Sequence, residues 1–174
     1  GLDQDAGIAA NPPFEMDNRS KRSIVLDLGA ADDRATAIEL ICGADVFITN
    51  LRPGALARLG LDHPTIAELA PHLVYGLITG YGVDGPDADR AAFDVAAFWA
   101  RAGLADLLTR PGDTPPFQRG GMGDHSSGMT MAAAVCAALL ARNRTAAGQL
   151  VTTSLYRQGA YTVSFDLNTM LLSG

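Results

Sequence analysis

Short apolar runs alternate with helical patterns in the first half of the chain. Three runs are rich in β-branched and other apolar residues and are bounded by turn residues, which predicts strands over residues 23–28, 46–49 and 73–79. Asp32 and Asp33 open a helical pattern, and two shorter helical pieces cover residues 55–59 and 65–70. Residues 1–17 show no clear period, and the Asn-Pro-Pro at 11–13 predicts an extended or turn conformation. Strands alternating with helices predict a parallel α/β sheet with right-handed crossovers.

The second half of the chain has a different pattern. A loop rich in Gly, Pro and Asp precedes apolar residues at helical spacing, which predict a helix over residues 94–108. Residues 111–123 are rich in Pro and Gly and are expected to be irregular. Residues 127–143 are apolar on nearly all sides, which predicts a buried helix. A strand over residues 149–154 and a last helix over residues 155–172 are expected to follow.

Composition indicates a globular protein. A chain of 174 residues, 48% hydrophobic and 18% charged, is long and apolar enough for one domain with a sizeable core. The net charge of −6 does not favour nucleic acid, and no apolar run is long enough to span a membrane. No secretory signal is visible at the start, so we expect a cytoplasmic protein. Cys42 and Cys136 are interpreted as small buried hydrophobes, and the spacing of His, Cys and acids predicts no metal site.

The most informative stretch is rich in glycine and contains a single carboxylate. Residues 120–128 read GGMGDHSSG and place Asp124 just before the long apolar helix. Glycines allow a ligand to approach closely, and Ser126 or Ser127 is expected to cap the helix. The positive end of that helix then favours the ionised form of Asp124. Such a carboxylate is a candidate nucleophile, while an Asp that merely caps a helix is the structural alternative.

Three further patterns are less specific. Residues 80–85 match G-x-G-x-x-G, but Pro86 and polar residues follow where a helix should begin, which excludes a dinucleotide site. Ser126 lacks the glycine that a hydrolase elbow needs two residues earlier, because Asp124 stands there. Asp94 opens the predicted helix at 94–108, where capping that helix is its expected role.

Five ordered blocks resemble the family III CoA-transferases, which include formyl-CoA transferase, carnitine CoA-transferase and α-methylacyl-CoA racemase. Residues 18–27 resemble the N-x-x-K-R-S-x-x-L-D strand of the family, residues 44–54 its A-D-V-x-x-x-N-x-x-P-G turn, residues 79–86 its strand-end loop, residues 123–129 its nucleophile loop, and residues 148–151 its G-Q-x-V segment. Family members are about twice this long, so we expect the chain to be incomplete.

The resemblance implies a fold and an activity. The fold is α/β, with a Rossmann-like parallel sheet and flanking helices, and it forms part of an interlocked homodimer. Residues 18–85 are expected to form the CoA-binding strand–helix units, and residues 86–174 the nucleophile loop, the buried helix and the following strand and helix. Together, residues 1–174 would be a fragment with one domain.

The implied reaction moves CoA from an acyl-CoA thioester to a free carboxylic acid. Asp124 would act as the nucleophile through a mixed anhydride and then an aspartyl-CoA thioester, and Asp94 would assist beside it. The CoA thioester is a substrate, and no permanently bound cofactor is expected.

The same resemblance implies a set of CoA-binding residues. They are Lys21, Asn50, Leu51, Arg58, Arg90, Ala91, Ala92, Phe93, Gly121 and Gly123. Backbone N–H groups around Gly120, Gly121 and Gly123 are expected to stabilise the oxyanion. Ala91 stands where formyl-CoA transferase has a lysine, so Arg90 would have to supply the positive charge there.

Two alternatives stay open. The first is a racemase or epimerase of the same family, whose members carry a catalytic His just before the acid that matches Asp94. Phe93 occupies that place and cannot carry a proton, which favours the transferase. The second is a non-catalytic fragment or subunit that helps to assemble a larger α/β protein. The expected partners are acyl-CoA and a carboxylic acid, with no nucleic acid and no membrane.

Overall fold

The structure is a computed structural model that describes residues 11–173. Its centre is a parallel sheet with the order β1 (Val46–Thr49), β2 (Val74–Thr79), β3 (Gln149–Ser154). Val46 lies opposite Val74, which in turn lies opposite Gln149. The parallel α/β architecture is therefore confirmed, and β1 and β3 have the predicted bounds.

The predicted strand over residues 23–28 is wrong. This segment is not hydrogen-bonded into the sheet, and Val25 is 93% exposed. Its β-branched residues favour an extended backbone, but a strand also needs a neighbour to pair with. Among the described residues, none pairs with this segment.

The expectation of an extended or turn conformation at residues 11–13 holds only for Asn11, whose backbone is extended, and is wrong for Pro12 and Pro13. Helix α2 (Pro12–Asp17) starts there, and the Asn11 side chain accepts a hydrogen bond from the Phe14 N–H at 3.1 Å. Proline is tolerated in the first turn of a helix because its missing N–H would have no helical partner. Residues 1–10 of the same prediction lie outside the described part.

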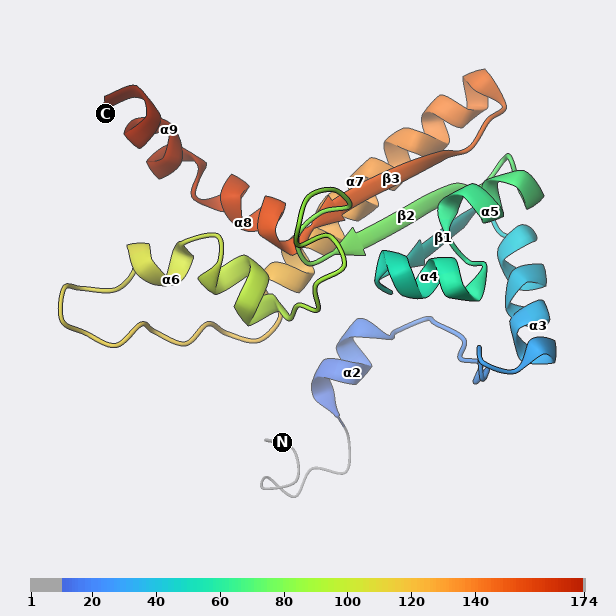
Figure 1. Ribbon diagram of the computed structural model, residues 1–174, viewed down its shortest axis with the longest axis horizontal. Helices are drawn as coiled ribbons and strands as arrows, with labels where there is room; N and C mark the ends of the chain where they lie inside the picture. The colour runs from blue at the N-terminus through green and yellow to red at the C-terminus, as the bar shows by residue number, and fades with distance from the viewer. Residues whose placement is uncertain (1–10, 174) are drawn as a thin grey trace.

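Helices cover both faces of the sheet (Figure 1). Helices α3 (Ala31–Cys42), α4 (Pro53–Leu59) and α5 (His63–Leu69) build a core with Tyr75 and Leu77 of β2. Helix α7 (Met122–Thr145) packs on the opposite face, where Met131, Val135 and Ala138 contact a core that includes Val74. Because β2 is covered on both sides, its side chains are almost all buried.

The predicted helix over residues 94–108 is divided in two. A π-helical turn, η1 (Val95–Ala100), comes first, and α6 (Leu104–Leu107) follows after Gly103, which has φ 93°. A left-handed residue of this kind ends a helix, and glycine adopts it at little cost. Phe98 and Trp99 of η1 pack against Leu155 of α8 (Leu155–Thr162) in a separate core cluster.

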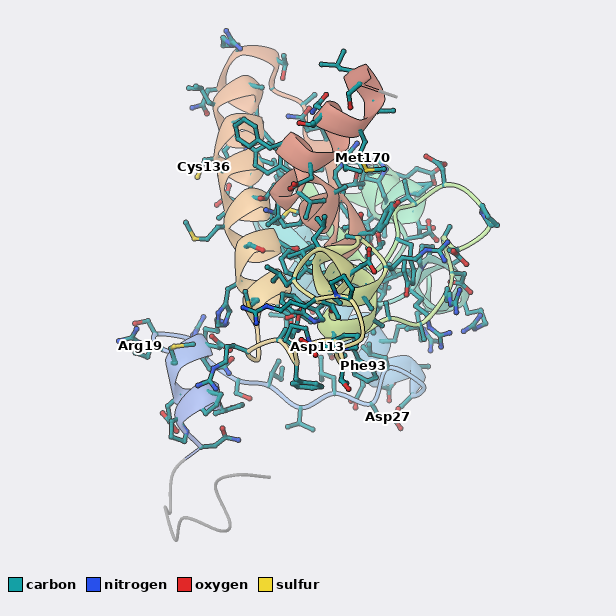
Figure 2. The ribbon with its side chains drawn as sticks, turned by 90° about the vertical axis from the view of Figure 1, so that its left-hand side faces the viewer. Arg19, Asp27, Phe93, Asp113, Cys136 and Met170 are labelled. Atoms are coloured by element: carbon teal, nitrogen blue, oxygen red, sulfur yellow. The ribbon has the colours of Figure 1, made fainter. Side chains whose placement is uncertain are left out.

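Helix α7 is buried along one face only, so the prediction of a fully buried helix is wrong. Met129 is 73% exposed, and Cys136 projects away from the other elements (Figure 2). The small alanines of this helix are compatible with either environment, so an apolar pattern does not require burial. Cys136 is therefore not the buried hydrophobe that was expected, whereas Cys42 packs partly against the core.

The predicted last helix is also divided. Helix α8 ends at Thr162, its C-cap Val163 leaves helical geometry, and a separate helix, α9 (Ser164–Ser173), follows (Figure 1). No residue of α9 is buried, and Phe165 and Leu172 are almost fully exposed. Within residues 11–173, no helix combines the length and apolarity that a bilayer crossing requires.

Candidate functional site

Asp124 lies in the first turn of α7 rather than in a loop ahead of it. The helix begins at Met122, and the residue before it, Gly121, has φ 76°. Ser126 is already inside the helix, and its hydroxyl donates to the Met122 carbonyl oxygen at 2.8 Å. Ser127 is buried in the next turn. The prediction that one of these serines caps the helix is therefore wrong.

The cap of α7 comes from Asp94. The Gly123 N–H donates to both carboxylate oxygens of Asp94, each at 3.1 Å, and the Asp124 N–H lies 3.4 Å from Oδ2. Asp94 is only 8% exposed. It makes no side-chain cap for η1, the helix that it precedes. The expected capping role thus exists, but it serves a different helix, whose first N–H groups would otherwise lack partners.

A cavity of about 250 Å³ opens beside these two carboxylates. It lies where β1 and β2 end, and its lining residues are Asn50, Ile78, Thr79, Gly80, Ala92, Phe93, Asp94, Asp124 and Leu155. Phe93, labelled in Figure 2, is 82% exposed. In open parallel sheets, ligands bind at this carboxyl edge of the strands. The structure therefore brings Asn50, Ala92 and Phe93 together with Asp94 and Asp124.

Gly80 explains how the loop after β2 reaches this cavity. A Cβ on Gly80 would lie 2.3 Å from the Cβ of Ala92, so only glycine lets the two segments touch. The loop is also attached to α4, because the Gly54 N–H donates to Asp89 Oδ1 at 2.9 Å. These contacts place Ala92 and Phe93 beside the end of β2.

Asp124 also lines a second cavity, of about 550 Å³. The residues around it come from α2 and from the start of α7: Pro12, Pro13, Met16, Asp17, Gly120, Gly121, Asp124 and His125. Asp124 thus lines two cavities and is exposed. Gly121, one of the predicted binding glycines, belongs to this second cavity.

The charges around Asp124 oppose its ionisation. Burial raises the pKa of Asp124 above its usual value, and the negative charge of Asp94 raises it further. His125 lowers this pKa, whereas Asp17 raises it, and the two side chains lie 3.3 Å apart (His125 Nε2 to Asp17 Oδ1). The expectation that the surroundings of Asp124 favour its ionised form is therefore wrong in direction, because burial and Asp94 raise the pKa.

The remaining predicted binding residues do not line the Asp124 cavities. Lys21 lines a separate cavity of about 650 Å³ with Arg22 and Ser23. Arg90 pairs with Asp87 at 3.3 Å and lies over the ring of Tyr81. Leu51, Arg58 and Ala91 are exposed, and Arg58 lies in the last turn of α4. Gly123 belongs to the site only through its contact with Asp94.

Two acids of the site region were missed by sequence reasoning. Asp17 reaches Asp124 from α2, and Asp89 holds the loop that carries Phe93. Neither lies in a motif, so the local sequence contains no signal for them. Within residues 11–173, no group of His, Cys, Asp and Glu is arranged to hold a metal ion.

Comparisons with known proteins identify the family. The model of CoA-transferase family III matches residues 3–174. Cinnamoyl-CoA:phenyllactate CoA-transferase of Clostridium sporogenes is 40% identical over 151 residues, which are 87% of this chain and 37% of that protein. (R)-2-hydroxy-4-methylpentanoate CoA-transferase of Clostridioides difficile is 34% identical, over 87% of this chain and 38% of that protein.

Solved structures agree with this assignment. The crystal structure of a CAIB/BAIF family protein from Brucella suis superposes with a TM-score of 0.83 at 32% identity, covering 90% of this chain and 41% of that chain. The chain thus spans about two fifths of the length of the relatives it matches. Because the family model matches residues 3–174, nearly the whole chain, the chain belongs to CoA-transferase family III.

Proposed function

We propose that the protein containing this chain is a CoA-transferase that moves CoA from an acyl-CoA thioester to a free carboxylic acid. The observation that carries the proposal is the position of Asp124, an exposed carboxylate that lines two cavities at the start of α7. Relatives that are named CoA-transferases support the same reaction class.

The proposed chemistry proceeds through two covalent states of Asp124. A carboxylate oxygen attacks the thioester carbonyl carbon and the C–S bond breaks, which gives a mixed anhydride on Asp124 and the free CoA thiolate. The thiolate then attacks the Asp124 carbonyl carbon, and the acyl group leaves as a free carboxylate. An acceptor carboxylate repeats these steps in reverse and leaves with CoA. The negative charge moves from Asp124 to sulfur and then to the released acid.

Each tetrahedral state needs hydrogen-bond donors for its oxyanion. The Gly123 N–H already donates to Asp94. We therefore assign this role to the N–H groups of Gly120 and Gly121, two residues that line the second cavity together with Asp124. By comparison with other oxyanion holes, each donor would contribute about 3 kcal/mol to the transition state.

The CoA moiety is proposed to extend from the cavity beside Asp124 toward the positively charged side chains of Lys21 and Arg58. Asn50, Ala92 and Phe93 would contact the part nearest the thioester, because they line the same cavity as Asp124. Lys21 and Arg58 carry the positive charge that phosphate groups require. We further propose that the whole protein is an interlocked homodimer in the cytoplasm, with no permanently bound cofactor.

The direct test uses the full-length enzyme and substitutes Asp124→Ala. Transfer of CoA should be lost, and mass spectrometry after incubation with acyl-CoA should detect no CoA attached to the protein. Asp113→Ala is a matched control, because Asp113 is an exposed carboxylate in the loop before α7 (Figure 2). Full activity in the Asp124 variant would refute the proposal.

A hydrogen-exchange measurement, together with the search for a CoA adduct, separates the two alternatives. A racemase would exchange the hydrogen next to the thioester carbonyl with deuterated solvent when no acceptor acid is present. A non-catalytic assembly subunit would show neither exchange nor a covalent CoA adduct in the full-length protein.

A further inference from the structure

The first turn of α7 holds two carboxylates with different surroundings. Asp94 is buried, and both of its oxygens accept backbone N–H groups from Gly123 and Asp124. Asp124 is more exposed and faces two cavities. Hydrogen bonds from N–H groups stabilise the charged form of a carboxylate. These contacts place the carboxylate of Asp94 against the first turn of α7, next to the backbone of Asp124.

We propose that Asp94 is a positioning residue for the nucleophile: it fixes the first turn of α7, and its charge favours the covalently modified Asp124 over the free carboxylate. This inference rests on the proposed function, in which Asp124 forms an anhydride and a CoA thioester.

The charge of Asp94 favours the covalent states because the side chain of Asp124 loses its own negative charge in them. Two neighbouring carboxylates repel each other in the free enzyme. When the oxygen of Asp124 bonds to an acyl carbon, or its carbonyl carbon bonds to the sulfur of CoA, the side chain becomes neutral. The charge leaves with the thiolate or the released acid, so the repulsion from Asp94 is relieved in both covalent states.

A proton and an acyl group neutralise Asp124 in the same way. The charge of Asp94, which raises the pKa of Asp124, therefore also favours its modified state. Two other charged groups act on the same carboxylate, Asp17 from α2 and His125 from α7 itself, with opposite signs. Because Asp17 and His125 are about half exposed, water screens them more than it screens Asp94.

The hydrogen bonds also limit what Asp94 can do. Both oxygens accept backbone N–H groups, so the carboxylate is held against the first turn of α7 while it caps the helix. An action through Asp124 therefore accounts for its burial and its contacts.

The experiment compares Asp94→Asn with Asp94→Ala in the full-length enzyme. Asparagine keeps an oxygen that accepts the N–H groups but removes the charge, whereas alanine removes both. We measure by mass spectrometry the ratio of CoA-bound to free enzyme in a fixed mixture of acyl-CoA and free acid, over a range of pH. Asp17→Asn serves as the matched control, because it removes a more exposed charge near the same nucleophile.

In Asp94→Asn, the ratio of bound to free enzyme should fall about tenfold for each unit by which the apparent pKa of adduct formation decreases. Asp17→Asn should also lower the ratio of bound to free enzyme and the apparent pKa of adduct formation, but by less than Asp94→Asn. The turnover of Asp94→Ala should be lower than that of Asp94→Asn, because asparagine still accepts the N–H groups of α7.

Three results would overturn the inference. An unchanged adduct ratio and pH profile in Asp94→Asn would exclude the role of the charge. Equal loss of turnover in the Asn and Ala variants, with an unchanged adduct ratio, would indicate direct proton transfer instead. If the Asn variant fails to fold, a midpoint of adduct formation in the wild type at or below the ordinary aspartate range would reject it. Absence of any adduct in the wild type would refute the proposed function itself, so the two failures are distinguishable.

Discussion

Gly123 approaches Asp94 so closely that no side chain fits between them. A Cβ on Gly123 would lie 2.3 Å from Asp94 Oδ1 and 2.4 Å from Cγ of Phe98. Both neighbours are buried, so neither can move aside without disturbing the core around η1. The hydrogen bonds that cap α7 therefore depend on glycine at this position because of the space available, rather than its backbone conformation.

Replacing Gly123 with alanine should separate α7 from Asp94. We expect the full-length enzyme to unfold at a lower temperature, by the equivalent of about 1–3 kcal/mol, and to lose most of its transferase activity. Gly128→Ala is the matched control in the same helix, because no atom other than its chain neighbours and the nearby backbone of α7 lies within 4 Å of the position its Cβ would take. That change should be neutral or stabilising, by up to about 1 kcal/mol. Equal unfolding temperatures of the Gly123 and Gly128 variants would contradict the close contact of Gly123 with Asp94 and Phe98.

The raised pKa of Asp124 predicts a pH-dependent cost to stability. The unfolded chain ionises this carboxyl first as the pH rises, so the folded state loses stability between the ordinary aspartate pKa and the raised one. Asp124→Asn should therefore unfold at a higher temperature than the wild type near pH 7, although it is inactive. The difference in unfolding temperature should vanish well below pH 4, where the Asp124 carboxyl is protonated in both the folded and the unfolded wild type. Asp113→Asn should show no such gain.

Arg142 fastens the far end of α7 to the loops before β1 and β2. Its guanidinium donates to Asp45 Oδ1 at 2.8 Å and to the carbonyl oxygens of Asp45 and His72 at 3.3 and 3.2 Å. Its side chain is 18% exposed, against 79% for Asp45. Arg142→Met should lower the free energy of unfolding by about 2 kcal/mol, because it also leaves carbonyl groups without a donor.

Asp45→Asn provides the contrast, because it removes only an exposed carboxylate and should cost less than about 1 kcal/mol. Urea unfolding of both variants measures the difference. If the Asp45 variant were the more damaged, the backbone contacts of Arg142 would not be the important ones.

Tyr75 makes the protein sensitive to alkali. Burial, with a smaller effect from the charge of Asp62, raises the pKa of its hydroxyl from 10.0 to about 12, and this hydroxyl donates to the Leu61 carbonyl oxygen at 2.6 Å. Above pH 10 the unfolded chain ionises while the folded one does not, so stability is lost between pH 10 and about 12.

Tyr75→Phe should cost about 1 kcal/mol at neutral pH and should lessen the additional loss at alkaline pH. Tyr161→Phe is the control, because that side chain is 75% exposed. Denaturant unfolding at neutral and alkaline pH gives both quantities. An unchanged alkaline slope in the Tyr75 variant would show that other groups cause the loss.

Local signals in the sequence were sufficient for β1 and β3, whose β-branched residues end at polar or turn residues. The same signal failed at residues 23–28, because propensity does not reveal whether a neighbouring strand exists. Gly103 divides the predicted helix 94–108 at a left-handed residue, a signal that was present in the sequence and was not used.

The candidate site shows a similar division. The glycine-rich motif pointed to Asp124, and the family resemblance predicted Asn50, Ala92 and Phe93 as CoA-binding residues. These residues line one cavity with Asp124, while their roles stay predictions. The electrostatics of Asp124 were not predictable locally. Asp94 acts on it from another helix, and Asp17 from the first described helix, so both effects depend on tertiary contacts.

The order of the strands has a consequence for biosynthesis. β2 ends at Thr79 and its partner β3 begins only at Gln149, so their pairing must close a long stretch of chain before it gains any contact energy. The cavity beside Asp124 needs both ends of that stretch, since Thr79 and Leu155 line it. We therefore expect a nascent chain to stay unreactive toward thioesters on the ribosome until α8 has emerged from the exit tunnel.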